Sequence, residues 1–176
     1  MFQKILVALD ASDHNQRVFE EAIALAKATN ACVMLLHVLT PFDEGYPTPI
    51  FPGADGVYPM LHQEAIDHYV HELENYERQG LEMLRMFNGK ALEAGVAVEF
   101  SQNVGNPGKV ICAIARSWDA DLVMMGRRGR VGLSEFLMGS VSNYVMHHAP
   151  CSILTVQGDI KAHPELAEEQ PEAVTA

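Results

Sequence analysis

Short apolar runs recur along the chain, separated by longer segments in which apolar residues are spaced three and four positions apart. Runs that are apolar without a break indicate strands covered on both faces of a sheet. One run alternates between apolar and polar residues, and this alternation predicts a strand at the rim of the sheet. The expected strands are residues 3–9, 31–39, 96–103, which is the alternating run, 121–125 and 151–156.

The longer segments have the spacing of amphipathic helices. Ser12 or Asp13 offers an N-cap for the first helix, and Asn30 is placed to end it. Asn106 and Pro107 have the order of an N-cap and a first helical position. The expected helices run from residue 12 or 13 to 30, over residues 61–94, from 107 to about 117, and from about 139 to 148.

Strands that alternate with helices are joined by crossover connections, which produce a mostly parallel sheet. We therefore expect an α/β fold, an open five-stranded parallel sheet with helices on both faces. Residues 40–60 hold five prolines and three glycines, which predicts a loop inserted between two elements. Residues 158–176 hold five acids, one lysine and two prolines, which predicts a disordered tail after a single domain at residues 1–157.

Charge and composition limit the partners of the 176-residue chain. It holds 12 lysines and arginines against 23 acids, a net charge of −11, which argues against nucleic acid or an anionic membrane surface as a partner. Its three cysteines are far apart and form no disulfide framework. No stretch approaches the roughly 20 apolar residues of a membrane span, and the first residues lack the pattern of a signal peptide. We therefore expect a cytoplasmic protein.

The strongest chemical signal lies between the fourth strand and the last helix. Glycines let backbone amides approach phosphate oxygens closely, and the start of a helix offers free N–H groups. Three arginines of an otherwise acidic chain fall within five positions here, which predicts an anion or phosphate cradle. The alternative is a glycine-rich surface loop with solvated arginines. The cradle residues are Gly126, Arg127, Arg128, Gly129, Arg130, Gly139, Ser140, Val141 and Ser142.

The spacing Gly-x2-Gly-x9-Gly-Ser in this segment resembles the ATP-binding signature of the universal stress protein family. The resemblance covers about residues 2–157 and implies a sheet of order 3-2-1-4-5, whose strand order reverses between the first and fourth strands. In open parallel sheets, ligands bind outside the carboxyl ends of the strands at such a point. The other segments that resemble the family are Lys4 to Ser12, Leu36-His37-Val38, Gly105-Asn106-Pro107 and Ala120 to Val123.

The resemblance also implies which residues contact a nucleotide. Ala8, Leu9 and Asp10 would lie beside the base and ribose, although the family usually has proline, then threonine or valine, where Ala8 and Leu9 stand. The backbone of Val38 would meet the adenine. Gly126, Arg127 and Gly129 would bracket the ribose and phosphates, and Gly139, Ser140 and Val141 would take the phosphates. The implied ligand is ATP, or AMP or ADP, with Mg²⁺ held through the phosphates.

The implied function is that of a nucleotide-responsive regulator in the stress response, with at most slow ATP hydrolysis, because the sequence offers no identifiable general base or nucleophile. Two alternatives remain. One is a magnesium-dependent ATPase or phosphotransferase that uses Asp10, and the other is a scaffold, gated by AMP or ATP, whose proline loop and long helix recruit a protein partner. Family members typically pair the fifth strand across a two-fold axis, so we expect a homodimer through residues 151–156.

No metal site is predicted from the sequence. Glu64, His68, His71 and Glu72 share one face of the expected long helix, because residues three and four apart are neighbours on a helix. Metal ligation would need such a cluster. The same pattern is more often a solvated polar face, and we interpret it in that way.

Overall fold

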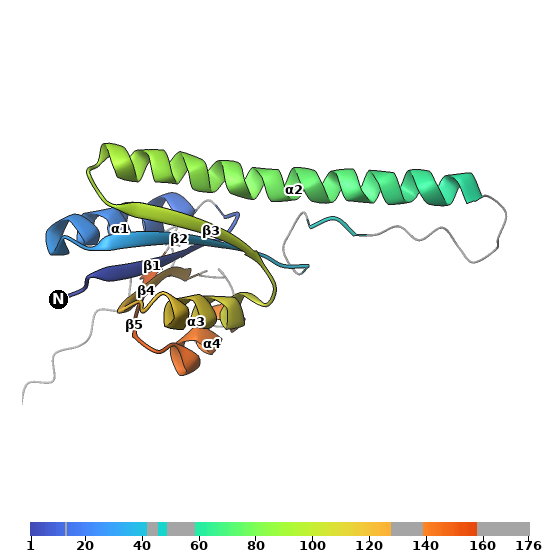
Figure 1. Cartoon of the computed structure of the whole chain (residues 1–176). Helices are drawn as coiled ribbons and strands as arrows, with labels where there is room; N and C mark the ends of the chain where they lie inside the picture. Colours follow the sequence, from blue (N-terminus) through green and yellow to red (C-terminus); the bar gives the residue numbers. More distant parts are fainter. Residues whose placement is uncertain (13, 42–45, 49–58, 128–138, 158–176) are drawn as a thin grey trace, which may run out of the picture.

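Five parallel strands and four helices alternate along the chain in the computed structural model (Figure 1), which describes residues 1–12, 14–41, 46–48, 59–127 and 139–157. The sheet has the order β3-β2-β1-β4-β5, and every pair of neighbouring strands is parallel. This confirms the α/β fold and the expected strand order. The elements are β1 (Lys4–Leu9), α1 (Asn15–Thr29), β2 (Cys32–Leu39), α2 (Pro59–Glu93), β3 (Val98–Val104), α3 (Pro107–Ser117), β4 (Leu122–Arg127), α4 (Ser140–His148) and β5 (Ser152–Gln157).

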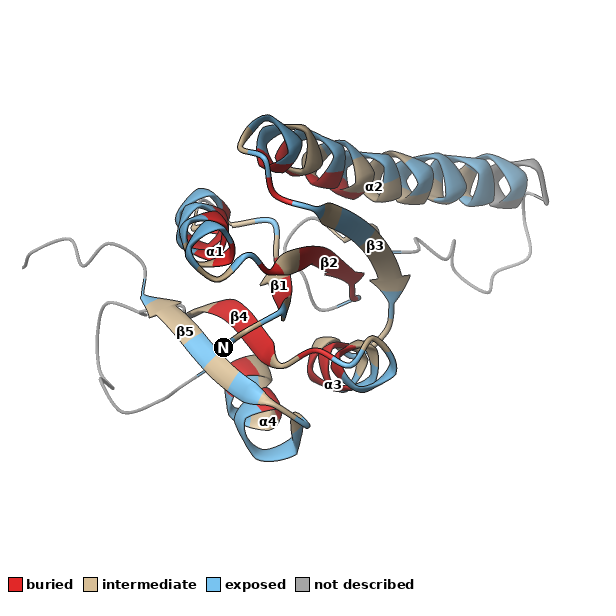
Figure 2. Ribbon diagram, turned by 60° about the vertical axis from the view of Figure 1, so that its left-hand side comes forward, coloured by how far each residue is buried: buried red, intermediate tan, exposed pale blue. Residues whose placement is uncertain are grey.

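The sheet is the middle of three layers, with α1 and α2 on one face and α3 and α4 on the other (Figure 2). Because side chains alternate along a strand, Ile5 and Val7 of β1 pack into the core beneath α1 and α2, whereas Leu6 packs into the core beneath α3 and α4. This explains why the central strands are apolar without a break. The two outer strands, β3 and β5, have no residue that is fully buried, so the expectation of a rim strand at residues 96–103 is confirmed.

The ends of the helices confirm some of the predicted caps and correct one. Asn30 ends α1 in the left-handed conformation, with φ of 53°, and the side-chain oxygen of Asn106 accepts a hydrogen bond from the Lys109 amide (3.2 Å) at the start of α3. The predicted cap at Ser12 or Asp13 is wrong, because α1 begins at Asn15 after His14. The Ser12 side chain instead donates a hydrogen bond to Asp10, and the structure of Asp13 lies outside the described residues.

Helix α2 is longer than the sheet that it covers. Its 35 residues rise about 52 Å at 1.5 Å per residue, whereas the eight residues of β2 span about 26 Å. The helix starts two residues before the predicted start and ends one residue before the predicted end. At Gly80 it meets the sheet so closely that a Cβ atom there would collide with the side chains of His37 and Gln102. The Gln102 side chain also donates to the Glu77 carbonyl oxygen (3.0 Å), which ties α2 to β3.

Most of the predicted loop at residues 40–60 and all of the predicted tail at residues 158–176 lie outside the described residues. Within the described part of the loop, the ring of Tyr46 packs edge-on against Tyr76 of α2, with 5.4 Å between ring centroids. None of the helices, over the residues that the structure describes, is both long and apolar enough to cross a membrane.

Helices α3 and α4 pack closely because Gly108, in the first turn of α3, has no side chain. A Cβ atom at this position would lie 2.7 Å from Cδ1 and 3.0 Å from Cβ of Tyr144 in α4. The Tyr144 ring stacks in turn on His148, with 4.0 Å between centroids. The position of α4 on the sheet therefore depends on a glycine in a neighbouring helix.

We expect the replacement Leu84→Ala to lower the free energy of unfolding by about 2–5 kcal/mol, because it leaves a cavity where α2 docks on the sheet. Leu84 is fully buried, whereas Leu92 of the same helix is 58% exposed. Urea denaturation followed by circular dichroism measures the change. The matched control, Leu92→Ala, should stay within about 0.5 kcal/mol of the wild type. Equal losses in the two variants would contradict the docking of α2 described above.

We expect Gly108→Ala to lower the free energy of unfolding by about 1–3 kcal/mol, because the added methyl group forces α3 and α4 apart. Thermal and urea denaturation measure this loss. Gly89→Ala in α2 is the control, since no described atom lies within 4 Å of a Cβ at Gly89. Removing a helical glycine there should stabilise the protein by up to about 1 kcal/mol. A neutral result for Gly108→Ala would show that α4 adjusts freely.

Candidate functional site

Strand β1 is the central strand of the sheet. Strands β2 and β3 lie on one side of β1, and β4 and β5 lie on the other, so the strand order reverses between β1 and β4. Helices that follow these two strands pack on opposite faces of the sheet, and in open parallel sheets ligands bind at such a point, outside the carboxyl ends of the strands. The fold therefore places its candidate ligand site at the ends of β1 and β4.

Residues predicted for the base and ribose come together at this edge. Ala8 pairs with Met125 in the register of β1 and β4, so Leu9 and Asp10 end β1 beside Gly126. On the other side of β1, Leu9 pairs with His37, and Val38 is the next residue of β2. Three neighbouring strands thus bring Ala8, Leu9, Asp10, Val38 and Gly126 to one stretch of the sheet edge.

The backbone of Asp10 is held by Asn15, a residue that the sequence reasoning missed. Asn15 lies in the first turn of α1 and is 7% exposed. Its side-chain oxygen accepts a hydrogen bond from the Asp10 amide (3.0 Å), and its side-chain nitrogen donates to the Asp10 carbonyl oxygen and contacts Sδ of Met83 in α2 (3.4 Å). An amide side chain at the start of a helix that follows a buried strand is the sequence signal that could have identified it.

The carboxylate of Asp10 shapes the turn that leaves β1. Its Oδ1 accepts hydrogen bonds from the Ser12 amide (3.0 Å) and from the Ser12 hydroxyl. A carboxylate that accepts from the backbone two residues later is a common turn device. With Asn15 fixing the peptide groups and Ser12 binding the carboxylate, the chain after β1 has a defined path beside the candidate site.

The second half of the site is the N-terminus of α4. The helix runs from the carboxyl edge of the sheet back to the amino end of β5, so its first turn lies at the same edge as the ends of β1 and β4. Gly139 is the N-cap, and no described side chain caps the helix. The first turn holds no acidic residue, so its N–H groups and the positive end of the helix dipole are available to an anion.

The residues at the start of α4 differ in accessibility. No described atom lies within 4 Å of the position that a Cβ atom at Gly139 would take, so the packing of the described residues does not require glycine there. Ser140 is exposed and Val141 is half-buried, whereas Ser142 is only 5% exposed. Of the two predicted hydroxyl donors, that of Ser140 is therefore the one open to the solvent.

The described contacts give a different reason for Gly126. A Cβ atom at Gly126 would lie 3.3 Å from Cγ2 of Val18 in α1, so the glycine allows the end of β4 to pack closely under α1. The backbone of Arg127 continues β4 and pairs with Gln157 of β5. Predicted site residues Arg128, Gly129 and Arg130 lie outside the described residues.

The thiols in the core are poorly suited to nucleophilic chemistry. Burial raises the pKa of Cys112, and although Arg116 acts in the opposite direction, its effect is smaller. Burial, the charge of Asp121 and the neighbouring Cys112 raise the pKa of Cys151. A raised pKa keeps a thiol protonated near neutral pH and lowers its nucleophilicity. Among the described side chains, no three His, Cys, Asp or Glu residues gather into a group that could hold a metal ion.

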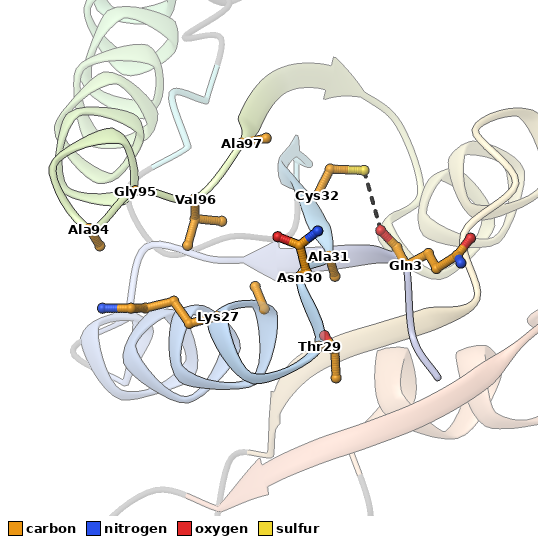
Figure 3. Close-up of a pocket in the computed structure, with 11 residues that line it drawn as sticks. Gln3, Lys27, Thr29, Asn30, Ala31, Cys32, Ala94, Gly95, Val96 and Ala97 are labelled. Carbon is orange, nitrogen blue, oxygen red and sulfur yellow. Dashed lines mark hydrogen bonds between the residues drawn. The ribbon is translucent and has the colours of Figure 1, made fainter.

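A hollow of about 670 Å³ lies at the opposite edge of the sheet (Figure 3). It is lined by residues around the amino ends of β1, β2 and β3, among them Gln3, Lys27, Asn30 and Cys32. The Cys32 thiol is directed at the Gln3 carbonyl oxygen (3.4 Å). Because ligands of open parallel sheets bind at the carboxyl ends of the strands, this hollow is a separate feature from the candidate site.

Several known proteins are similar to this chain. The universal stress protein Sll1388 of Synechocystis sp. is 38% identical over 160 residues, which are 89% of this chain and 98% of that protein. A universal stress protein in complex with cAMP has a TM-score of 0.61 at 22% identity, over 89% of this chain and 97% of that one. A universal stress protein family member from Arabidopsis thaliana with AMP bound has a TM-score of 0.56 at 24% identity, over 93% of this chain and 97% of that one.

At these identities the two structures show a shared fold and no more. The sequence relationship is broader, because the model of the universal stress protein family matches residues 1–157. That range contains every strand and helix of the described structure. The chain belongs to the universal stress protein family.

Proposed function

We propose that this chain binds an adenine nucleotide between the end of β1 and the start of α4, and that the bound nucleotide regulates its activity in the stress response. The observation that carries the proposal is the N-terminus of α4, at the edge where the strand order reverses, where no described side chain caps the helix and no described atom fills the space at Gly139. Family members solved with AMP and with cAMP support the choice of ligand.

Each part of the ligand has a place in the proposed arrangement. Ala8, Leu9 and Asp10 bind the ribose and base, and the backbone of Val38 meets the adenine. Gly126, Arg127 and Gly129 bracket the ribose and phosphates, and Arg128 and Arg130 add positive charge. The N–H groups and dipole of α4 bind the phosphates of ATP, ADP or AMP, with Mg²⁺ held through those phosphates. The phosphate-binding residues are Gly139, Ser140, Val141 and Ser142.

The hydrogen bonds at Asp10 favour regulation over catalysis. A general base needs a carboxylate oxygen that can accept a proton from a reacting group. Oδ1 of Asp10 already accepts two hydrogen bonds from Ser12, and these hold the turn after β1. These hydrogen bonds give Asp10 a positioning role, and since the sequence offers no identifiable general base or nucleophile, we expect hydrolysis of ATP to be slow at most.

Gly139→Val tests the site without disturbing the fold. The N-cap backbone, with φ of −55° and ψ of 151°, is accessible to valine, and the added side chain points into space that no described atom fills. It would occupy the place proposed for the phosphates. We expect isothermal titration calorimetry with ATP, ADP, AMP and cAMP to show binding by the wild type and at least about tenfold weaker binding by the variant, the loss of about 1.4 kcal/mol or more.

The control for this test is Gly89→Val, because a Cβ atom at Gly89 also meets no described atom within 4 Å. It lies on α2, away from the proposed site, and should bind nucleotide like the wild type. If none of the four nucleotides binds the wild type, the proposed function is wrong. If Gly139→Val binds as tightly as Gly89→Val, the phosphates bind elsewhere.

We also propose that the chain forms a homodimer through β5, residues 151–156 of the sequence prediction. This strand is at an edge of the sheet, and Leu154 is 43% exposed on it. Edge strands with exposed apolar side chains are commonly paired with another chain. In the described sheet, β5 pairs with β4 alone, so its other edge is open to a partner.

Leu154→Lys should convert the proposed dimer into a monomer, because a lysine on an edge strand opposes pairing with an identical edge. Light scattering coupled to size exclusion at micromolar concentrations measures the mass of both proteins. Leu92→Lys, at an exposed position near the C-terminal end of α2, is the control and should leave the mass of the dimer unchanged. A monomeric wild type at these concentrations would refute the proposed dimer.

A further inference from the structure

Helix α2 consists of a docked half and a projecting half. From residue 63 onward, where burial is described, its buried residues lie in the second half, at Gly80, Leu84, Phe87 and Ala91, where the helix packs on β2 and β3. From residue 63 to residue 79 no residue of the helix is fully buried. Figure 1 shows this first half extending past the ends of the strands.

The apolar face of the docked half continues without a break into the projecting half. Residues three and four apart lie on the same face of a helix. We call this row of residues the α2 seam. In its projecting part Tyr69, Leu73 and Tyr76 are half-buried, whereas Ile66 is 55% exposed and the adjacent Val70 is 45% exposed. The seam consists of Ile66, Tyr69, Leu73, Tyr76, Gly80, Leu84, Phe87 and Ala91.

One side of the projecting seam has a contact within the chain. Tyr46 packs on Tyr76. The pKa of Tyr46 is raised, first by burial and then by the charge and hydrogen bond of Tyr69 and the charge of Glu77. Ile66 and Val70 remain exposed beyond this contact. Two β-branched apolar residues on adjacent turns, in line with a buried seam, are unusual on a solvated helix, whose exposed face is normally polar.

The charge around the projecting half has one sign. The sequence contains no lysine or arginine between Lys27 and Arg78, whereas residues 43–77 contain eight acids. At 100° per residue, Asp67 and Glu74 lie along one side of the seam and Glu72 lies along the other. Arg78, at the end of the projecting half, lies 3.9 Å from the Glu82 carboxylate.

We propose that the projecting part of the α2 seam binds a basic amphipathic helix of a partner protein. An apolar stripe on such a helix would cover Ile66, Val70 and Leu73, and its lysines or arginines would lie opposite the acids that flank the seam. Flanking charges of opposite sign select the partner of a helix pair. A second copy of this helix would place acids opposite acids, so the charge pattern disfavours self-pairing through this surface.

Designed peptides test the proposal on the full chain. The first is an 18-residue peptide with leucines at three- and four-residue spacing and lysines at the other positions. The second replaces the lysines by glutamates, and the third keeps the composition of the first but moves the leucines off a common face. We expect the first to bind with a dissociation constant in the micromolar range by fluorescence anisotropy, and the other two to bind at least about tenfold more weakly.

Substitutions locate the binding surface. The double variant Ile66→Ser and Val70→Ser should weaken binding of the lysine peptide at least about tenfold, because it removes the apolar part of the surface. Both positions are exposed, so circular dichroism melting should match the wild type. Met86→Ser is the control. Met86 is 48% exposed on the same helix, opposite the seam, and its loss should not change binding.

Several outcomes would overturn the proposal. These are no binding of the lysine peptide at millimolar concentration, equal binding of the lysine and glutamate peptides, and an equal loss in the double variant and in Met86→Ser. Sedimentation equilibrium tests whether a second copy of the chain, and not a partner helix, binds the seam. A self-association that the Ile66 and Val70 double variant abolishes would show that the seam binds a second copy of the chain.

Discussion

The pairing of β1 with a neighbour on each side is the interaction on which the rest of the structure depends. Six residues of β1 pair with β2 and four pair with β4, and the strand contributes side chains to both cores. A strand in this position has no wet face, so its side chains must be apolar at every position that faces a helix. The strand order also reverses between β1 and β4, and the candidate site lies at the carboxyl ends of these two strands.

The elements could be predicted from the sequence because their signals are local. A continuous apolar run or a three- and four-residue spacing identifies a strand or a helix from its own residues, and Asn30 and Asn106 cap their helices as predicted. The strand order came from resemblance to a family, since periodicity does not say which strands are neighbours. The predicted N-cap of α1 was wrong because the Ser12 side chain binds Asp10, the residue that follows β1.

The parts of the site that escaped prediction depend on contacts between distant segments. The role of Asn15 depends on its contacts in the folded chain, where its side chain meets Asp10 at the end of β1 and Met83 of α2. The reason for glycine at positions 108 and 126 cannot be read from the sequence, which does not show whether a glycine makes room for a ligand or for another helix. The structure shows that Tyr144 and Val18 are the neighbours of these two glycines. Of Gly108, Gly126 and Gly139, only Gly139 faces space that no described atom fills.

The central place of β1 also determines when the fold can be completed during synthesis. Ile5 pairs with Leu122, so β1 acquires its second neighbour only after more than a hundred further residues have been synthesised. Contacts between residues so far apart in sequence slow folding, and an apolar strand with an open edge is prone to aggregate in the meantime. The nascent chain therefore carries an unprotected edge on β1 until β4 arrives, a period in which binding by a chaperone would be of most benefit.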